Sequence, residues 1–300
     1  MKPRLIITGS GGFVAGAIVA QSGHDWETHA CSRGKPLLER DGLQWHSFDL
    51  LDAEVLRRVF REAKPHAVIH AAAMADINYC EARQDEAEAM NVGVTRTLAQ
   101  LCRDNGAKMV YLSTDNVFDG VQGNYREEDL PGPVNFYAET KARAERIVAA
   151  QPNAVVVRVA VVMGLPVLGS GNSFLSRMVP SLEQGRDIYV PDNEIRTPID
   201  VITLGRALLE LAGNDVIGYI HLAGNDRLNR FAMVQRIVRR LGYSPSLVIA
   251  RNPVAVPGRA PRPLDVSLDN TKARTMLQTP MRGLDDGIDL ILAAKKGVSS

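Results

Sequence analysis

The chain has 300 residues, a formal net charge of +1, 45% hydrophobic residues and 23% charged residues. These values are those of an ordinary globular protein, so they argue against extensive disorder. A charge this close to zero gives no basic field for capturing nucleic acid. The length suits one large α/β domain carrying a smaller lobe, and we expect its partners to be small molecules.

Cysteine usage and hydropathy bear on disulfide bonds, metal binding and the cellular compartment. Cys31, Cys80 and Cys102 have no close spacing, and the six histidines form no ligand-spaced cluster with them, so we predict neither a disulfide framework nor a structural metal. No apolar run approaches the length of a membrane span. The apolar residues after Met1–Arg4 are too few for a signal-peptide core, so we expect a cytoplasmic protein that does not enter a membrane.

In the first half of the chain, short β-branched runs alternate with amphipathic stretches, the pattern of a parallel sheet covered by helices. Apolar residues at spacings of three and four predict helices over 54–63 and 86–103. The pattern predicts a doubly wound, Rossmann-type α/β fold. The expected strands are residues 5–7, 28–31, 44–48, 67–70, 109–112 and 155–157.

The amino-acid composition changes after about Gly164, where glycine, proline and serine become frequent. Helices are expected over 174–184 and 232–241. The prolines within 251–264 exclude regular helix or central strand there, so we expect an ordered loop. We therefore divide the chain into a Rossmann domain, 1–163, and a smaller C-terminal lobe, 164–300, some segments of which return to the Rossmann core.

A glycine-rich turn, Thr8 to Gly16, follows the first expected strand. Gly9 allows a sharp turn, and Gly12 allows the backbone to approach a pyrophosphate that faces the amides of the next helix. We expect Gly9, Gly12, Phe13 and Val14 at a dinucleotide, which makes the N-terminal domain the cofactor domain and the lobe the substrate-binding part. Taken alone, such a turn also fits a plain strand-to-helix connection.

The residues after the second and third strands bear on which dinucleotide binds. A carboxylate after the second strand would bind the ribose hydroxyls of NAD, but Ser32 and Arg33 stand there and could hold a 2′-phosphate. NADP(H) is therefore favoured, with NAD(H) possible, and a solvated basic loop is the alternative. Asp49 and Leu50, after the third strand, could meet the adenine, although Asp49 could equally cap a turn.

Tyr137 and Lys141 are four residues apart on an expected helix, which places the phenol and the ammonium on one face. A free tyrosine has a pKa of about 10, and Lys141 together with a positive nicotinamide ring should lower it. Thr114 ends the fifth strand, at the edge where doubly wound sheets bind ligands, and could hydrogen-bond the same carbonyl; capping is the alternative use of Ser113 and Thr114. The set predicts an enzyme, an NAD(P)-dependent oxidoreductase acting on a carbon–oxygen bond.

Four segments resemble the dTDP-4-dehydrorhamnose reductase branch of the extended short-chain dehydrogenase/reductase family: Ser-Thr-Asp-Asn-Val-Phe-Asp-Gly at 113–120, Tyr-Arg-Glu-Glu-Asp at 125–129, Pro-Val-Asn-Phe-Tyr at 133–137 and Arg-Pro-Leu-Asp-Val-Ser-Leu-Asp at 262–269. The resemblance implies that Tyr137 is the catalytic acid, that Lys141 holds the ribose and tunes Tyr137, and that Thr114 assists. It also implies that the cofactor is lined by Ala71, Ala72 and Ala73, and that the substrate is faced by Thr114, Asp115 and Asn116.

The resemblance implies an NADP(H)-dependent reductase of a 4-keto nucleotide sugar, with Tyr137 as proton donor. Two alternatives stay open. The same branch includes a non-catalytic, NADP-binding regulatory subunit of methionine adenosyltransferase that shares the 125–129 segment, and a nucleotide-sugar epimerase would use a similar site. A dehydratase fits less well because Asn116 cannot serve as the acid that elimination needs. A homodimer is possible.

The chain also departs from that branch. Val161 and Met163 stand where an aromatic pair is usual, Asn116 replaces a tyrosine, and the segment 194–198 differs from the common glycine-and-proline version. Three arginines could be diphosphate ligands or ordinary ion-pair and surface residues, the latter being favoured. They are Arg158, Arg196 and Arg262.

Overall fold

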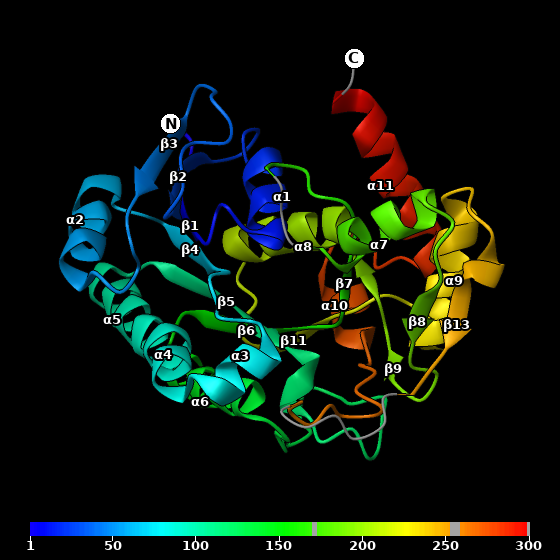
Figure 1. Ribbon diagram of the computed structural model, residues 1–300. Helices are drawn as coiled ribbons and strands as arrows, with labels where there is room; N and C mark the ends of the chain where they lie inside the picture. The colour runs from blue at the N-terminus through cyan, green and yellow to red at the C-terminus, as the bar shows by residue number, and fades with distance from the viewer. Residues whose placement is uncertain (170–172, 253–258, 299–300) are drawn as a thin grey trace.

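The computed structural model describes residues 1–169, 173–252 and 259–298. Its centre is a sheet of seven parallel strands in the order β11-β6-β5-β4-β1-β2-β3 (Figure 1). The strands are β1 (Arg4–Thr8), β2 (Glu27–Ser32), β3 (Leu43–Ser47), β4 (Ala67–His70), β5 (Lys108–Thr114), β6 (Ala154–Val159) and β11 (Gly218–Leu222). The order reverses between β1 and β4, so the predicted doubly wound, Rossmann-type fold is confirmed.

Helices cover both faces of the sheet because successive side chains of each strand point to opposite sides. Leu5 and Ile7 of β1 pack on one side, and Ile6 packs on the other. The first face is covered by α1 (Phe13–Gln21), α8 (Val201–Gly213) and α10 (Thr271–Met276). The second is covered by α2 (Ala53–Ala63), α5 (Val94–Asn105) and α6 (Phe136–Ala149).

The expected helix over 86–103 is present as one continuous helical run that contains a π-helical turn. After α3 (Ile77–Ala82), the chain forms α4 (Gln84–Glu88), a π-helical turn at Ala89–Gly93 and then α5. The turn carries Asn91, whose buried side chain bonds both the amide and the carbonyl of Met74. These long-range bonds explain why a helix-like pattern contains a π-helical insertion, a feature frequent at functional sites.

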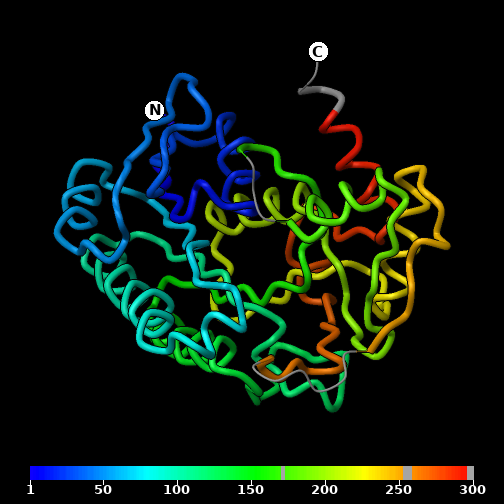
Figure 2. The backbone as a smooth tube through the Cα atoms, in the orientation of Figure 1, coloured from blue at the N-terminus to red at the C-terminus, as the bar shows by residue number. Residues whose placement is uncertain are grey.

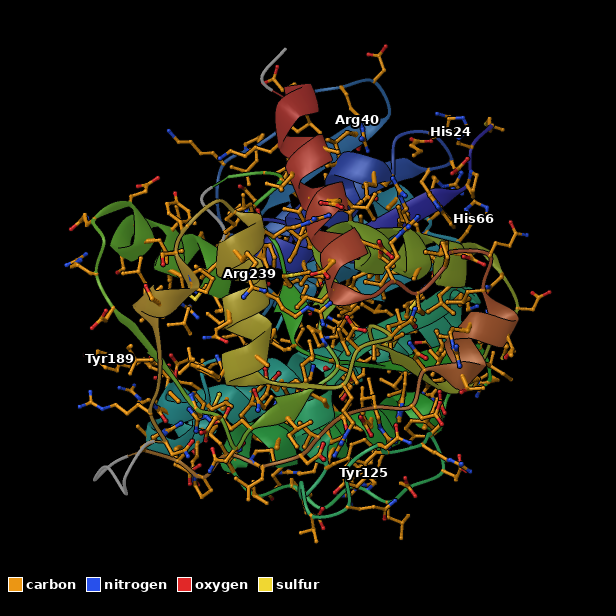
Figure 3. All side chains as sticks on the ribbon, turned by 90° about the vertical axis from the view of Figure 1, so that its right-hand side faces the viewer. His24, Arg40, His66, Tyr125, Tyr189 and Arg239 are labelled. Atoms are coloured by element: carbon orange, nitrogen blue, oxygen red, sulfur yellow. The ribbon has the colours of Figure 1, made fainter. Side chains whose placement is uncertain are left out.

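The C-terminal lobe has its own apolar core. It is built from α7 (Phe174–Glu183), α9 (Arg230–Arg240), α11 (Leu284–Val298) and the parallel pair β8 (Ile188–Val190) and β13 (Val248–Ala250). Two further pairs are β7 (Val162–Met163) with β10 (Ile199–Asp200), and β9 (Ile195–Arg196) with β12 (Leu228–Asn229). On β8, Tyr189 is exposed and stacks beneath Arg251 (Figure 3).

The chain crosses between the two parts more than once. After β6 it enters the lobe, then returns to build α8 against α1 and to add β11 to the edge of the main sheet (Figure 2). Residues 259–264 follow an irregular path, and 253–258 lie outside the described residues. Among the described helices, none has the length and apolar character needed to cross a bilayer.

Candidate active site

A cleft of about 420 Å³ opens where the carboxyl ends of β4, β5 and β6 face the C-terminal lobe. This is the edge at which doubly wound sheets bind their ligands. The cofactor side of the cleft is lined by Val14, Ala71 and Ala73, its centre by Thr114, Asp115, Asn116, Tyr137 and Lys141, and its lobe side by Glu194, Arg196, Arg230 and Arg262. The structure thus brings the expected catalytic residues and part of the expected cofactor set into one cleft.

The glycine turn has the backbone that a pyrophosphate site needs. Gly9 has φ +74°, and a Cβ there would lie 2.9 Å from the Cα of Ala72, so a side chain is excluded. Gly12 is the N-cap of α1, no side chain caps the helix, and its first turn holds no acidic residue. The free amides that begin at Phe13 and Val14 therefore present the positive end of the helix dipole to an anion.

Ser32 and Arg33 lie beside this turn. Ser32 is nearly buried, and a Cβ on Gly11 would sit 3.8 Å from that of Ser32, so β2 ends against the glycine turn. Arg33 is exposed and makes no hydrogen bond or ion pair with any residue that the structure describes. Asp49 Oδ1 accepts a bond from the amide of Leu51 at 3.0 Å, which is the turn-capping use that the sequence left open, and Leu50 is buried.

Tyr137 lies in the first turn of α6. The helix begins after Asn135, whose side chain accepts from the amide of Ala138, while its Nδ2 donates to the carbonyl of Pro261. Burial raises the pKa of the Tyr137 phenol, and a hydrogen bond with Thr114 partly opposes that shift. The phenol and the strand-end hydroxyl therefore meet inside the cleft, as the sequence predicts.

Lys141 makes two contacts that the sequence does not predict. Its Nζ donates to the carbonyl oxygen of Leu112 at 2.6 Å and lies 4.2 Å from the centre of the Tyr111 ring. Burial lowers the pKa of Lys141 to about 7, with Glu145 opposing. The expected lowering of the Tyr137 pKa by Lys141 is not seen here, because the ammonium is turned to the carbonyl and burial dominates the titration of the phenol.

Asp115 and Asn116 continue from Thr114 into a short 3₁₀ turn, Asp115–Val117. The Thr114 hydroxyl donates to Asp115 Oδ1 at 3.2 Å and accepts from the amide and from Nδ2 of Asn116, both at 3.2 Å. Burial raises the pKa of the Asp115 carboxyl, and Arg196 opposes that shift. The three side chains therefore form one bonded group at the centre of the cleft.

The structure distinguishes the three arginines that the sequence left open between diphosphate binding and ion pairing. Arg158 is 2% exposed and forms a buried ion pair with Glu145 at 3.0 Å, so it is an ion-pair residue and not a diphosphate ligand. Arg196 and Arg262 both line the cleft. Arg196 donates to the carbonyls of Ile195, Leu264 and Pro263, and Arg262 to Ala260 and Asn78.

Sequence reasoning missed two groups near the cleft. Buried Glu194 lies 3.3 Å from Arg230 and 3.6 Å from Arg259, which nothing in the local sequence joins. His70 is also buried, between the hydroxyls of Thr8 (2.7 Å) and Thr95 (3.0 Å). The signal for His70 was a polar residue ending an apolar strand just before the expected cofactor alanines.

The chain of bonds around His70 fixes its tautomer. Thr95 gives its only hydroxyl hydrogen to the carbonyl of Asn91, so His70 Nε2 donates to Thr95 and Nδ1 accepts from Thr8. Thr8 in turn accepts from the amide of Ala72 at 3.3 Å. Burial lowers the pKa of His70 to about 3, so the neutral ring ties the glycine turn to the alanine loop.

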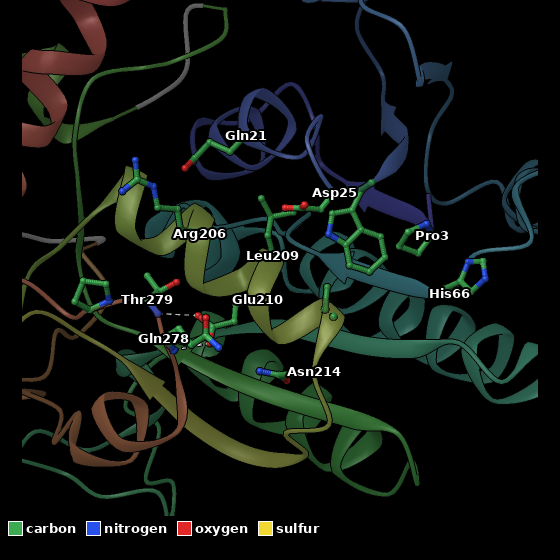
Figure 4. A pocket seen from close by; sticks show the side chains of 14 residues that line it. Pro3, Gln21, Asp25, His66, Arg206, Leu209, Glu210, Asn214, Gln278 and Thr279 are labelled. Atoms are coloured by element: carbon green, nitrogen blue, oxygen red, sulfur yellow. Dashed lines mark hydrogen bonds between the residues drawn. The ribbon is translucent and has the colours of Figure 1, made fainter. Parts of the chain in front are cut away.

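A larger groove, of about 1030 Å³, lies at the opposite, amino-terminal edge of the sheet (Figure 4). It is lined by residues that precede the strands, such as Pro3, Trp26 and His66. The Glu210 carboxylate at its floor already accepts from the amides of Gln278 and Thr279. This groove lacks the glycine turn and the acid–base residues, so its size does not make it the active site.

The reversed strand order, the uncapped glycine turn and the tyrosine–lysine helix together define a protein of the extended short-chain dehydrogenase/reductase class. Within that class, the family model described as RmlD substrate binding domain matches residues 2–296, and the chain belongs to this family.

Two kinds of named relative match almost the whole chain. The chain is 30% identical over 305 residues to dTDP-4-dehydrorhamnose reductase from Mycobacterium tuberculosis, covering 99% of this chain and 95% of the relative. It is 29% identical over 294 residues to methionine adenosyltransferase 2 subunit beta from Mus musculus, covering 93% and 85%. Sequence identity alone therefore does not favour one of these two relatives over the other.

Solved structures agree on the fold. A hypothetical dTDP-4-dehydrorhamnose reductase from Sulfolobus tokodaii superposes with a TM-score of 0.82 at 29% identity, covering 95% of this chain and 98% of that one. The Bacillus anthracis dTDP-4-dehydrorhamnose reductase, solved with NADP, gives 0.84 at 24% identity, covering 98% and 99%. MoeE5, solved with UDP-glucose and NAD, gives 0.79 at 22% identity, covering 99% and 100%.

These comparisons confirm the resemblance stated from the sequence and the expected class, the NAD(P)-dependent oxidoreductases. The neighbours include NADP and NAD complexes, in agreement with NADP(H) being favoured and NAD(H) possible.

Proposed function

We propose that this protein is an NADP(H)-dependent reductase of a 4-keto nucleotide sugar. One observation carries the proposal: Thr114, Tyr137 and Lys141 line one cleft that extends to the cofactor side of the sheet, at Val14, Ala71 and Ala73. A cleft that holds a proton-donating phenol and lies beside a glycine-rich turn able to bind a dinucleotide suits the reduction of a carbonyl.

The residues present fit a dinucleotide. The Gly9–Gly12 turn leaves room for a pyrophosphate, which the uncapped amides of α1 would bind. Arg33 is free to pair with a 2′-phosphate next to Ser32, which favours NADP(H) over NAD(H). The small side chains of Ala71 and Ala73 leave a flat apolar wall for the nicotinamide.

Bound NADPH supplies the hydride that reduces the carbonyl carbon. In the proposed reaction Tyr137 gives its proton to the carbonyl oxygen, so the ketone gains one hydride and one proton and becomes an alcohol. Thr114 turns its single hydroxyl hydrogen from Asp115 Oδ1 to the same oxygen. Lys141 turns from Leu112 to the ribose and to Tyr137. The cationic lobe side of the cleft, which includes Arg230 and Arg262, suits the diphosphate of a nucleotide sugar.

The test is NADPH oxidation, followed by absorbance, with a dTDP-4-keto-6-deoxy sugar as substrate. In Tyr137→Phe we expect kcat to fall by about 10²–10⁴-fold, the usual contribution of a positioned acid, with NADPH affinity unchanged. Phenylalanine keeps the ring that packs beside Cys80, so the fold should survive. Undiminished turnover in the variant would refute the proposed role of Tyr137.

A regulatory subunit is the second candidate, favoured by the similarity to methionine adenosyltransferase 2 subunit beta. That function predicts tight NADPH binding, no turnover of any ketone, and capture of a partner enzyme from the native host. An epimerase, in contrast, would convert a nucleotide sugar without net NADPH consumption, and product stereochemistry would reveal it.

A further inference from the structure

Asn135 joins the start of α6 to the segment that carries Arg262. Its Oδ1 accepts from the amide of Ala138 at 2.9 Å, which caps the helix, and its Nδ2 donates to the carbonyl oxygen of Pro261 at 3.0 Å. A serine or an aspartate would cap the helix equally well. Asn135 is only 7% exposed, so its amide nitrogen needs a partner inside the protein. The bond to Pro261 is therefore the contact that a serine or an aspartate could not make.

The segment 260–264 depends on side chains of other elements for its shape. Two of its five residues are prolines, which have no amide hydrogen, so the segment cannot pair as a regular strand. Asn135 of α6 holds the carbonyl of Pro261, and Arg196 of β9 holds the two carbonyls on either side of residue 263's peptide, those of residues 263 and 264. The position of Arg262 is thus set by bonds from both the Rossmann part and the lobe.

The short helix α3 completes a frame around the two segments. Asn78 Oδ1 accepts from Arg262 Nη2 at 3.0 Å and from the amide of Ala260 at 3.2 Å. The Glu81 carboxylate accepts from the first amide of α6 at 3.1 Å. Residues three apart lie on one face of a helix, so a single face of α3 contacts both the start of α6 and the Arg262 segment. The bond from Asn135 closes this ring.

The ring fixes two cleft residues relative to each other. Tyr137 follows Asn135 by two residues, and Arg262 follows Pro261 by one. Both side chains line the cleft. A ketone that reaches Tyr137 while its diphosphate meets Arg262 requires a defined separation between the two, and small misplacements of positioned groups are costly. The bond between Asn135 and Pro261 joins the backbone beside one residue to the backbone beside the other.

We propose that Asn135 is a positioning residue, which holds Arg262 at the distance from Tyr137 that a nucleotide sugar requires by donating to the carbonyl of Pro261. This inference rests on the proposed function and deepens it, because it assigns the diphosphate of the substrate to the segment that Asn135 holds. Asn135 acts through Arg262, so loss of its amide weakens diphosphate binding and leaves proton transfer by Tyr137 unchanged.

The test is Asn135→Ser, which keeps a hydroxyl that caps α6 and removes the amide that reaches Pro261. Two diphosphate probes, dTDP and UDP, are titrated into the protein–NADP⁺ complex by calorimetry. For each probe that the wild type binds, we expect the dissociation constant to rise about three- to tenfold, as for the loss of one hydrogen bond. The urea midpoint and the NADP⁺ affinity should not change. An unaltered dissociation constant, or a wild type that binds neither probe, would overturn the inference.

A double-mutant cycle shows whether Asn135 acts through Arg262. In an Arg262→Ala background, Asn135→Ser should have no further effect on probe affinity, because the side chain that it positions is gone. An equal loss in both backgrounds contradicts the inference. Glu139→Gln is the matched control, because Glu139 is an exposed residue in the first turn of the same helix and does not line the cleft, and this variant should bind the probes as the wild type does.

Steady-state kinetics separate this inference from the proposed function. With NADPH and the 4-keto sugar, Asn135→Ser should raise KM and leave kcat near the wild-type value, since binding is weakened while the acid stays in place. A fall in kcat at unchanged KM would assign Asn135 to Tyr137 alone and refute its action through Arg262. Probe binding that depends on Asn135, in a wild type that turns over no ketone, contradicts the proposed function and leaves the diphosphate assignment standing.

Discussion

Lys141 is a buried cation whose charge state depends on what occupies the cleft. In the free protein burial lowers its pKa to about 7, so at pH 8 the amine is mostly neutral. Ribose oxygens of a bound cofactor would accept hydrogen bonds from the ammonium and raise that pKa. NADPH binding at pH 8 should therefore take up a proton at Lys141, and at pH 6, where the side chain is already charged, the uptake should vanish.

Calorimetry in buffers of different ionisation enthalpy measures this uptake directly. Lys141→Met cannot take the proton, so its binding enthalpy at pH 8 should vary less with the buffer than that of the wild type. A wild-type enthalpy at pH 8 that does not depend on the buffer would show that Lys141 stays at the carbonyl of Leu112 when the cofactor binds.

At the same scale, the sequence predicted which residues meet in the cleft better than how they are oriented. The four-residue spacing of Tyr137 and Lys141 and the strand-end position of Thr114 fix their places on the backbone. The direction of the Lys141 side chain depends on the Leu112 carbonyl and the Tyr111 ring, which no local pattern reveals. The same holds for Arg158, whose partner is 13 residues away on another element.

At the scale of elements, β6 and α6 are joined by a buried ion pair. Arg158 bonds both oxygens of Glu145, whose Oε1 also accepts from Ser113 at 2.5 Å. The guanidinium lies 4.8 Å from the centre of the Phe118 ring and 4.6 Å from that of Tyr219. Because both charges are buried, each depends on the other for compensation.

Removing one partner should be costly. Arg158→Met or Glu145→Gln should each lower the free energy of unfolding by about 3–5 kcal/mol, because an uncompensated charge or polar group stays buried. Urea unfolding measures the change, and the double variant should lose less than the sum. The exposed pair Arg57–Glu54 is the control, and Glu54→Gln should change stability little. A similarly small loss in Glu145→Gln would contradict this account.

Sequence periodicity predicted the positions of helices and strands wherever the local propensity of a segment agrees with its tertiary contacts. All six predicted strands of the first half are present. Apolar, β-branched runs mark β4 and β6, which are buried on both faces, whereas the edge strand β3 is only partly buried and has no β-branched residue. The helix over 86–103 is present, but it contains a π-helical turn that the tertiary bonds of Asn91 to Met74 and Thr140 stabilise. The sequence did not predict this turn because the partners of Asn91 lie in distant segments.

For the whole molecule, the alternation of strands and helices predicted the doubly wound sheet, since parallel neighbours need helical crossovers. The division of the chain at residue 163 stays a prediction. The sequence predicted that some segments of the second half return to the Rossmann core, but it could not show which ones, because α8 and β11 resemble any amphipathic helix and any short strand. Their apolar side chains nevertheless fill one face of the main sheet.

This re-entry makes the Rossmann part dependent on the lobe sequence. Burying one large aliphatic side chain contributes about 1.5–3 kcal/mol, so five of them contribute about 7–15 kcal/mol, as much as the net stability of a typical domain. Five of the buried residues that the second half contributes to this face are Leu204, Leu208, Leu211, Ile220 and Leu222.

A fragment of residues 1–163 should therefore not fold cooperatively, since it leaves β6 as an uncovered edge and leaves one sheet face covered by α1 without α8 and α10. We expect it to bind a hydrophobic dye and to lack a sigmoidal urea transition, whereas the full chain unfolds cooperatively. Co-expression with residues 164–300 should restore NADPH binding, because the second fragment supplies α8 and β11. A cooperative transition and NADPH binding by 1–163 alone would show that the first half is an independent domain and that α8 and β11 only cover a sheet that is already stable.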